Sequence, residues 1–328
     1  MDIPDFIVTG GQERHTPQGH EWNRYGEGRV ARVSPATGTV ELLTRYVSPP
    51  EACAWDETPG ILFKSGQIHD GKLYVCTQTE VLVYRLSDMA RVGYVSLPMF
   101  NDVHHVMVRG NGNLVVVSTG LDTVVEVTEA GEVVSEHNVL GQDTWARFSR
   151  EVDYRKVLTT KPHHAHPNFA FELQGEMWAT RFAQRDAVCL TDLSRRIPVD
   201  VQSPHDGVVR DDEVFFTTVD GRVVVSDHAA GRVKDVYDLN LISGQKGVSL
   251  GWCRGLKLLD RRVALVGFTR VRPTKIQQNV AWVKYVTGVA KTKSVNKTRV
   301  AAYDLEAGEL LWEQVLEDVG MHALFSIL

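Results

Sequence analysis

Residues 102–137 read DVHHVMVRGNGNLVVVSTGLDTVVEVTEAGEVVSEH. This stretch contains four short runs that are rich in β-branched residues and are separated by turn residues such as Asn111-Gly112. The runs are 102–108, 114–119, 123–127 and 132–137. Such runs, bounded by Asn-Gly or Asp-Gly turns, are typical of antiparallel strands joined by tight hairpins. The stretch therefore predicts one four-stranded antiparallel sheet.

The same unit recurs along the chain. Its copies begin near Lys64, His104, His166, His205, Arg254 and His322. Successive starts are 40, 62, 39, 49 and 68 residues apart, and the two longest intervals contain non-repetitive insertions at about 142–161 and 271–298. Removing the insertions returns both intervals to about forty residues, which is the period of a propeller blade. The repeat therefore predicts six blades.

The last copy has only one strand before the chain ends. Three runs near the N-terminus, at 5–9, 29–34 and 39–46, can supply the other three strands. Propellers close their ring by sharing one blade between the two ends of the chain. We therefore predict an all-β, six-bladed β-propeller with four-stranded blades, formed by residues 1–328 as a single domain. A β-sandwich, which needs no such shared sheet, is the second choice.

Composition narrows the class of protein. Hydrophobic residues make up 43% and charged residues 23% of the chain, which is ordinary for a globular protein. The sequence has no apolar run of transmembrane length, and its first residues have neither a basic start nor an apolar stretch, so we expect no secretory signal. The four cysteines are far apart, which argues against a zinc knuckle or a disulfide framework. The net charge of −5 argues against nucleic acid as a partner, and we expect a cytoplasmic protein.

The starts of the six copies also carry the candidate functional residues. The first strand of each blade lines the central channel of a propeller, so residues at its start converge at one mouth of that channel. Five of these starts carry His104, His166, His205, Arg254 and His322. Neutral imidazoles favour Zn, Fe, Mn, Cu or Ni over Ca or Mg. We therefore expect the four histidines to bind a divalent transition metal.

Neighbouring histidines must be distinguished from these four. His105 alternates with His104 in one strand, so only one of the two can face the channel. His164 shares the alternation of His166 and could lie on the axis as well. His105 and His164 are therefore the alternative ligands.

Three further residues are candidates for catalysis. Arg254 presents a planar fork that suits a carboxylate, phosphate or sulfate, so we expect a small anionic organic substrate. Asn168 could donate a hydrogen bond to a substrate oxygen, or simply cap the start of a strand. Asp206, which follows His205, and Asp102 could each fix an imidazole tautomer, or cap a turn.

The second insertion is strongly basic. Residues 261–303 contain ten Lys or Arg and no Asp or Glu. Apolar residues between 276 and 286 approximate helical spacing, which predicts a short amphipathic helix inserted in the fifth blade. The segment could be a lid that attracts an anionic substrate, a contact surface for membrane phospholipid or a protein, or a solvated excursion packed on the blade edge. The insertion at 142–161 leads directly into the histidine-rich segment and could form a pocket wall.

The stretches 102–114 and 122–127, together with His166-Pro167-Asn168, resemble blades of the bacterial arylsulfotransferase-type six-bladed propellers. In that family a central histidine accepts the sulfuryl group, and other histidines, an asparagine and an arginine surround it. The resemblance covers the two middle blades. It implies a centre made of His104, His166, Asn168, His205, Arg254 and His322.

A four-histidine axis also resembles, more loosely, the iron sites of carotenoid oxygenases, whose propellers have seven blades. Gluconolactonase-like propellers bind metal largely through carboxylates and asparagine, which the blade starts here lack.

These observations predict an enzyme with a histidine-lined metal site at the mouth of the channel. The expected reaction is metal-assisted hydrolysis, elimination or oxidation of a small anionic substrate. The first alternative is metal-free group transfer through a central histidine, as the resemblance implies. The second alternative is a non-catalytic propeller that binds protein partners through its rim.

Overall fold

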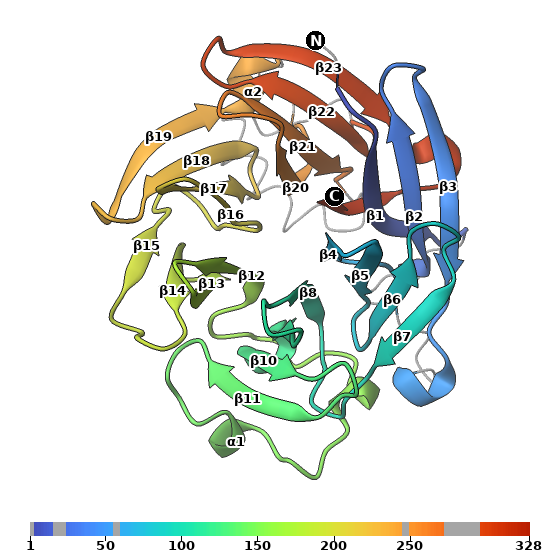
Figure 1. Ribbon diagram of the computed structural model, residues 1–328, viewed down its shortest axis with the longest axis vertical. Helices are drawn as coiled ribbons and strands as arrows, with labels where there is room; N and C mark the ends of the chain where they lie inside the picture. The colour runs from blue at the N-terminus through green and yellow to red at the C-terminus, as the bar shows by residue number, and fades with distance from the viewer. Residues whose placement is uncertain (1–2, 16–23, 55–59, 245–248, 272–295) are drawn as a thin grey trace.

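The computed structural model describes residues 3–15, 24–54, 60–244, 249–271 and 296–328. Its strands form six four-stranded antiparallel sheets arranged as blades around a central axis (Figure 1). The predicted six-bladed β-propeller is therefore confirmed. No helix in the described ranges is long and apolar enough to cross a membrane.

The blades follow the chain in order. Blade 1 consists of β4 (Gly66–His69), β5 (Lys72–Cys76), β6 (Val81–Arg85) and β7 (Arg91–Val95). Blade 2 consists of β8 (Val103–Val108), β9 (Leu114–Ser118), β10 (Thr123–Val127) and β11 (Val133–Asn138). Blade 3 consists of β12 (Pro167–Leu173), β13 (Glu176–Arg181), β14 (Asp186–Cys189) and β15 (Arg196–Pro198).

The remaining three blades complete the ring. Blade 4 consists of β16 (Val208–Arg210), β17 (Glu213–Thr218), β18 (Arg222–Asp227) and β19 (Arg232–Asp238). Blade 5 consists of β20 (Trp252–Leu258), β21 (Val263–Thr269), β22 (Arg299–Asp304) and β23 (Glu309–Val315). Blade 6 consists of β24 (Ala323–Ile327), β1 (Phe6–Glu13), β2 (Tyr25–Ser34) and β3 (Thr39–Tyr46).

Burial follows the position of each strand in its blade. Every residue of β9 and of β21 is buried, and both strands are apolar up to their last residues, Ser118 and Thr269, because neighbouring blades cover both faces of the middle of a blade. The outermost strands β11 and β23 are largely exposed or half-buried. The first strands of consecutive blades contact one another from β4 through β24, so they form the inner ring.

Apolar side chains fill every seam between adjacent blades. Six hydrophobic clusters each combine residues from two neighbouring blades, including the pair formed by blade 6 and blade 1. Phe100, Phe216 and Phe268 are among the largest fully buried side chains. Burial of these side chains removes apolar surface from water around the whole ring, so the closed ring is more stable than an open arc of blades would be.

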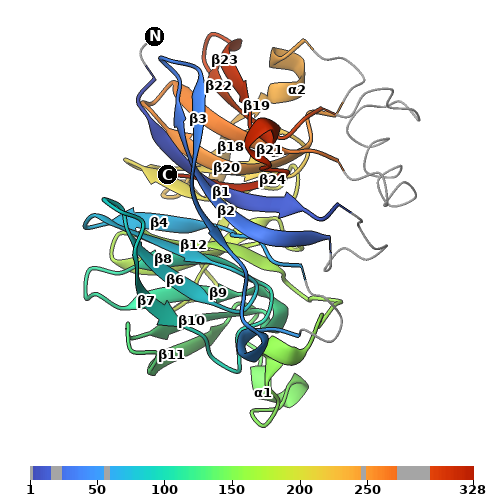
Figure 2. The same ribbon diagram turned by 90° about the vertical axis from the view of Figure 1, so that its right-hand side faces the viewer.

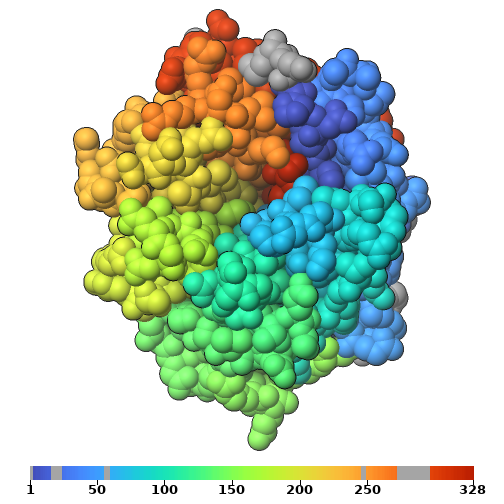
Figure 3. All heavy atoms as spheres, in the orientation of Figure 1, coloured from blue at the N-terminus to red at the C-terminus, as the bar shows by residue number. Residues whose placement is uncertain are grey.

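Blade 6 joins the two ends of the chain, as predicted. The C-terminal strand β24 pairs antiparallel with β1, with Val8 opposite Ile327 and Gly11 opposite Ala323. Figure 2 shows these two strands side by side. In the space-filling view, the dark red C-terminal residues lie among the blue N-terminal strands and the orange residues of blade 5 (Figure 3).

Helical structure is sparse among the described residues. The helices are α1 (Thr144–Arg147) and α2 (Leu239–Ile242). Short 3-10 turns are Pro50–Ala52, Thr119–Leu121, Tyr154–Lys156 and Glu317–Val319. The insertion at 142–161 contains α1 and lies between blades 2 and 3, whereas the basic insertion lies within blade 5, between β21 and β22. The amphipathic helix expected near 276–286 lies outside the described residues.

Candidate functional site

A cavity of about 460 Å³ lies where the inner strands meet. Five blades contribute wall residues at or just before their first strand, and blade 6 contributes Phe325. These wall residues include Lys64, Asp102, His104, His166, His205, Arg254 and Phe325. Residues 155, 157–159 and 161–163, which follow α1, also line the cavity. Part of the first insertion therefore forms a wall of this pocket.

Three of the expected histidines meet in the cavity wall. The ring centre of His104 lies 5.2 Å from that of His166 and 6.2 Å from that of His205. The ring of Phe325 lies 6.3 Å from His104 and 5.8 Å from His205. Three imidazoles from three different blades thus share one partly apolar pocket.

His104 belongs to a buried polar network with Lys64 and Asp102. The Lys64 ammonium donates to Asp102 Oδ1 at 2.5 Å and lies 3.3 Å from His104 Nδ1. His104 Nδ1 lies 2.7 Å from the backbone oxygen of Asp102, which only accepts hydrogen bonds. If Nδ1 carries the ring proton, Nε2 is the lone-pair nitrogen of His104. Burial and the Lys64 charge lower the pKa of His104 well below its ordinary value, so the ring is neutral at neutral pH.

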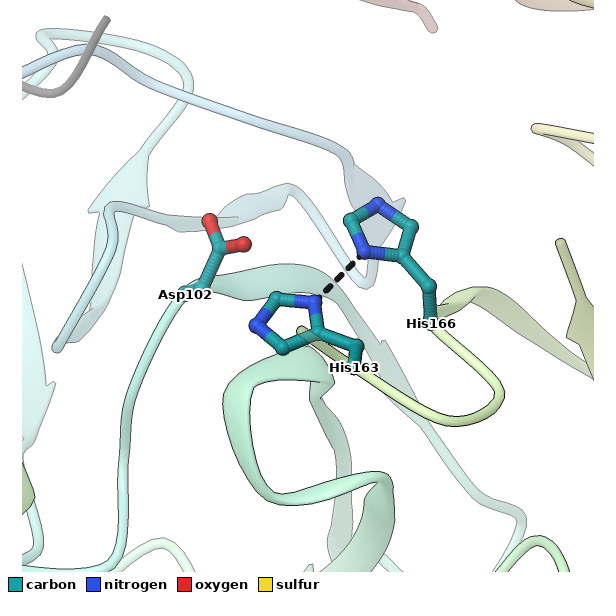
Figure 4. A group of neighbouring side chains, drawn as sticks. All are labelled: Asp102, His163 and His166. Atoms are coloured by element: carbon teal, nitrogen blue, oxygen red, sulfur yellow. Dashed lines mark hydrogen bonds between the residues drawn. The ribbon is translucent and has the colours of Figure 1, made fainter. Parts of the chain in front are cut away.

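Among the described residues, Asp102, His163 and His166 form a cluster with the spacing of metal ligands (Figure 4). One ligand atom from each side chain can be chosen so that all three lie within 4.8 Å of one another. His163 Nδ1 and His166 Nδ1 are 2.6 Å apart, so one donates a hydrogen bond to the other. Burial raises the pKa of Asp102, but the Lys64 ammonium outweighs burial and holds it well below its usual range. Burial lowers the pKa of His166 to about 3. The cluster therefore offers a carboxylate and two neutral imidazoles.

Two members of the cluster have unusual backbone conformations. Asp102 and His166 adopt left-handed φ angles of 50° and 56°. This region is uncommon for residues other than glycine, and such conformations persist only where the surroundings hold them.

Asp122 provides this support for the His163–His166 segment. Its carboxylate accepts hydrogen bonds from the backbone N–H groups of His164 at 2.8 Å, Ala165 at 3.0 Å and His166 at 2.8 Å. Arg147 of α1 donates to the same carboxylate at 3.2 Å. The Asp122 side chain is almost fully buried, so these bonds form in a low-dielectric environment where they are strong.

On another side of the cavity, His205 is paired with Asp206. His205 Nδ1 lies 3.4 Å from Asp206 Oδ1, and both side chains are 3% exposed. Asn168, also in the wall, donates through Nδ2 to the backbone oxygen of Pro204 at 3.1 Å. Its Oδ1 has no hydrogen-bond partner among the described residues. The expected candidates Asn168 and Asp206 are therefore brought together with His205.

Cationic groups dominate the charged part of the wall. Among the described lining residues, Asp102 is the one carboxylate, and the cations are Lys64, Arg155, Lys161 and Arg254. Arg254 Cζ lies 4.3 Å from the ring centre of Phe325 and 5.9 Å from that of Trp252, which are cation–π contacts. With neutral histidines, this wall creates a positive potential that attracts anions.

The structure does not bring His322 into this group. His322 precedes β24, is not part of the cavity wall, and accepts a hydrogen bond at Nδ1 from the backbone N–H of Glu13 at 3.1 Å. Burial and the nearby Arg270 lower its pKa. The third residue of β24, Phe325, occupies the cavity position of this blade instead.

The two alternative ligands do not lie in the wall either. His105 points away from the axis, because its ring stacks on Phe169 at 3.7 Å and Nδ1 accepts a hydrogen bond from Ala170 N at 3.2 Å. His164 is exposed. The alternation argument was therefore correct in separating His104 from His105.

Sequence reasoning missed two parts of the cluster. Asp102 was considered only as a partner that orients an imidazole, and His163 was not a candidate. The signal for His163 was present in Pro162-His163-His164-Ala165-His166, where three histidines fall within four residues. Strand alternation does not apply there, because the segment before β12 is a loop.

Comparisons with known proteins support the fold alone. No protein-family model matches the sequence, and no curated protein matches it. A protein of unknown function from Bacteroides caccae is similar in structure, with 14% identity, a TM-score of 0.62, and coverage of 99% of this chain and 98% of that chain. A chain of a nidogen/laminin complex is similar with 10% identity, a TM-score of 0.56, and coverage of 98% and 97%. At these identities, the comparisons identify the chain as a β-propeller and assign no activity to it.

Proposed function

We propose that this propeller is a metal-dependent enzyme whose ion is bound by Asp102, His163 and His166. The observation that carries the proposal is the approach of these three ligand atoms to within 4.8 Å of one another beside a cavity. His104 stands next to this set, with its ring centre 5.2 Å from that of His166. This ligand set replaces the four histidines expected from the sequence. His322 lies outside the cavity wall, and His205 is assigned another role below.

The donor set indicates which metals fit. Two imidazoles and one carboxylate suit Zn, Fe, Mn, Cu or Ni, and two histidines with one carboxylate leave coordination positions open. A metal with an open position supplies Lewis-acid activation or activation of water or O₂. Lys64 keeps the Asp102 carboxylate ionised, and burial keeps both histidines neutral, so all three can donate an electron pair.

The wall of the cavity favours an anionic organic substrate. Lys64 and Arg254 come from different blades and present positive charge to the same volume. Phe325 and Trp252 add aromatic surface beside Arg254. A volume of about 460 Å³ suits a small molecule. The reaction class is metal-assisted hydrolysis, elimination or oxidation.

Metal titration tests the proposal. Protein prepared without chelator or metal-affinity resin should bind about one Zn²⁺, Fe²⁺ or Mn²⁺ per chain by calorimetry and elemental analysis. We expect His163→Ala and His166→Ala each to weaken binding by at least ~100-fold, because each removes one of three protein ligands.

His137→Ala is the matched control, because His137 lies on the outer strand β11, outside the cavity wall, and should leave binding unchanged. Substoichiometric metal that is indifferent to His163→Ala and His166→Ala would overturn the proposal. Loss of binding in His205→Ala and His322→Ala, with His163→Ala unaffected, would overturn this ligand set in favour of the four-histidine set.

Metal-free group transfer is the second candidate, as the resemblance to arylsulfotransferase-type propellers implies. It is favoured by three neutral imidazoles that share a cavity with Lys64 and Arg254. After incubation with an aryl sulfate donor, mass spectrometry should then find sulfuryl mass on His104, His166 or His205. An unmodified protein under these conditions would eliminate this candidate.

A further inference from the structure

His205 differs from the histidines of the metal cluster in its surroundings. It lines the cavity, is 3% exposed, and neither Nδ1 nor Nε2 makes a hydrogen bond to the described residues, although Nδ1 lies 3.4 Å from the Asp206 carboxylate. A buried polar nitrogen without a partner is costly unless a ligand or water satisfies it. Its position in the wall indicates that the missing partner binds in the cavity.

Asp206 places a carboxylate beside Nδ1 of this imidazole. Asp206 Oδ1 lies 3.4 Å from His205 Nδ1, and Oδ2 accepts hydrogen bonds from Gly255 N at 2.8 Å and from Thr217 Oγ1. The backbone N–H of His205 donates to Thr217 O at 2.9 Å. The carboxylate is therefore held by β17 and β20 and cannot easily turn away.

This arrangement favours one tautomer of His205. A carboxylate beside Nδ1 favours the form that carries its proton on Nδ1, because the carboxylate can only accept. Nε2 then holds a lone pair. Burial lowers the pKa of His205, although the Asp206 carboxylate opposes this effect. The ring is thus a neutral acceptor with its lone pair available to a bound molecule.

We propose that His205, oriented by Asp206, is the proton acceptor for a substrate bound between it and the Asp102/His163/His166 cluster. The proposal rests on the proposed function and deepens it. It requires an organic anion with an acidic O–H, or a C–H beside a carboxylate. In the step, the Nε2–H bond forms as the substrate O–H or C–H bond breaks. The electron pair stays on the substrate atom, where the cationic wall of Lys64 and Arg254 stabilises it.

Two measurements test the pair formed by His205 and Asp206, called the dyad below, without knowledge of the substrate. Nitrogen NMR of the histidine-labelled protein should find His205 as the neutral tautomer with its proton on Nδ1. Diethyl pyrocarbonate at neutral pH should modify His205 Nε2. In Asp206→Asn the amide can donate to Nδ1, which moves the ring proton to Nε2, so we expect modification of His205 to slow by at least ~10-fold. Zn²⁺ binding should be unchanged in Asp206→Asn and in His205→Gln.

Each possible result has a defined meaning. A ring proton on Nε2 in the wild-type protein, or equal modification of wild type and Asp206→Asn, would overturn the dyad. Loss of Zn²⁺ binding in His205→Gln would also overturn it, since His205 would then be a ligand. Absence of Zn²⁺ binding in the wild-type protein, with the expected tautomer and reactivity, would instead refute the metal proposal and leave the acceptor role intact. The tautomer is measured on the wild-type protein, so this test does not depend on whether any variant folds.

Discussion

Replacing Asp122 with alanine should destabilise the protein by about 3–5 kcal/mol and abolish metal binding. The substitution removes the acceptor of the backbone N–H groups of His164, Ala165 and His166 and leaves Arg147 without this carboxylate. Alanine must also adopt the left-handed φ of 55°, which costs roughly 1 kcal/mol more. Urea denaturation measures the first effect, and Zn²⁺ titration of the folded variant measures the second.

Asp122→Asn and Asp88→Ala separate the causes. Asparagine tolerates the left-handed conformation and keeps one acceptor oxygen, so Asp122→Asn should lose less than half as much stability. Asp88 is exposed and accepts from Ala90 N and Arg85, so Asp88→Ala should cost under about 1 kcal/mol. An Asp122→Ala variant that is as stable as Asp88→Ala and still binds Zn²⁺ would show that the carboxylate does not organise the segment.

The fold was predictable because its signals are local and repeated. Turns such as Asn111-Gly112 and Asp220-Gly221 separate β-branched runs, and the unit of short strands recurs about every forty residues once the insertions are removed. The lone final strand then required the N-terminal strands as partners. The convergence of His104, His166 and His205 followed from the repeat, because equivalent positions in different blades face the same axis.

The position of His322 could not be predicted in the same way. In β20, the cavity residue Arg254 is the third residue of the strand, and in β24 the third residue is Phe325. The register of β24 against β1 also shifts between Thr9 and Gly10. A shift of this kind depends on the paired strands and changes which side chains face the core. Counting from the repeat alone therefore pointed to His322, which precedes this strand, whereas Phe325 within the strand lines the cavity.

The geometry of the Asp102/His163/His166 cluster was also beyond sequence reasoning, for a different reason. Asp102 and His166 depend on left-handed backbone conformations that sequence patterns do not specify for these residue types. His163 reaches His166 only because Asp122, from the preceding blade, holds the loop between them. These contacts are non-local, so the closely spaced histidines at 163–166 mark candidate ligands but do not show which of them meets Asp102.

The closure of the ring should be most sensitive at Gly10. A Cβ at this position would lie 1.8 Å from the backbone oxygen of Ala323, which cannot move without disturbing the pairing of β1 with β24. We expect Gly10→Ala to lower the free energy of unfolding by about 3 kcal/mol or more, measured by urea denaturation. β24 also carries Phe325, which lines the cavity. We therefore expect Gly10→Ala also to weaken those contacts between the cavity and a bound ligand that do not involve a metal.

Gly110→Ala is the matched control for this prediction. A Cβ at Gly110 meets no atom within 4 Å, and its φ lies outside the left-handed region, so the same substitution should change stability by no more than about 0.5 kcal/mol. Equal stability of the two variants would mean that β1 and β24 can move apart enough to accommodate a methyl group. In that case the two ends of the chain would be joined less tightly than the packing of Leu324 and Ile327 against blade 5 requires.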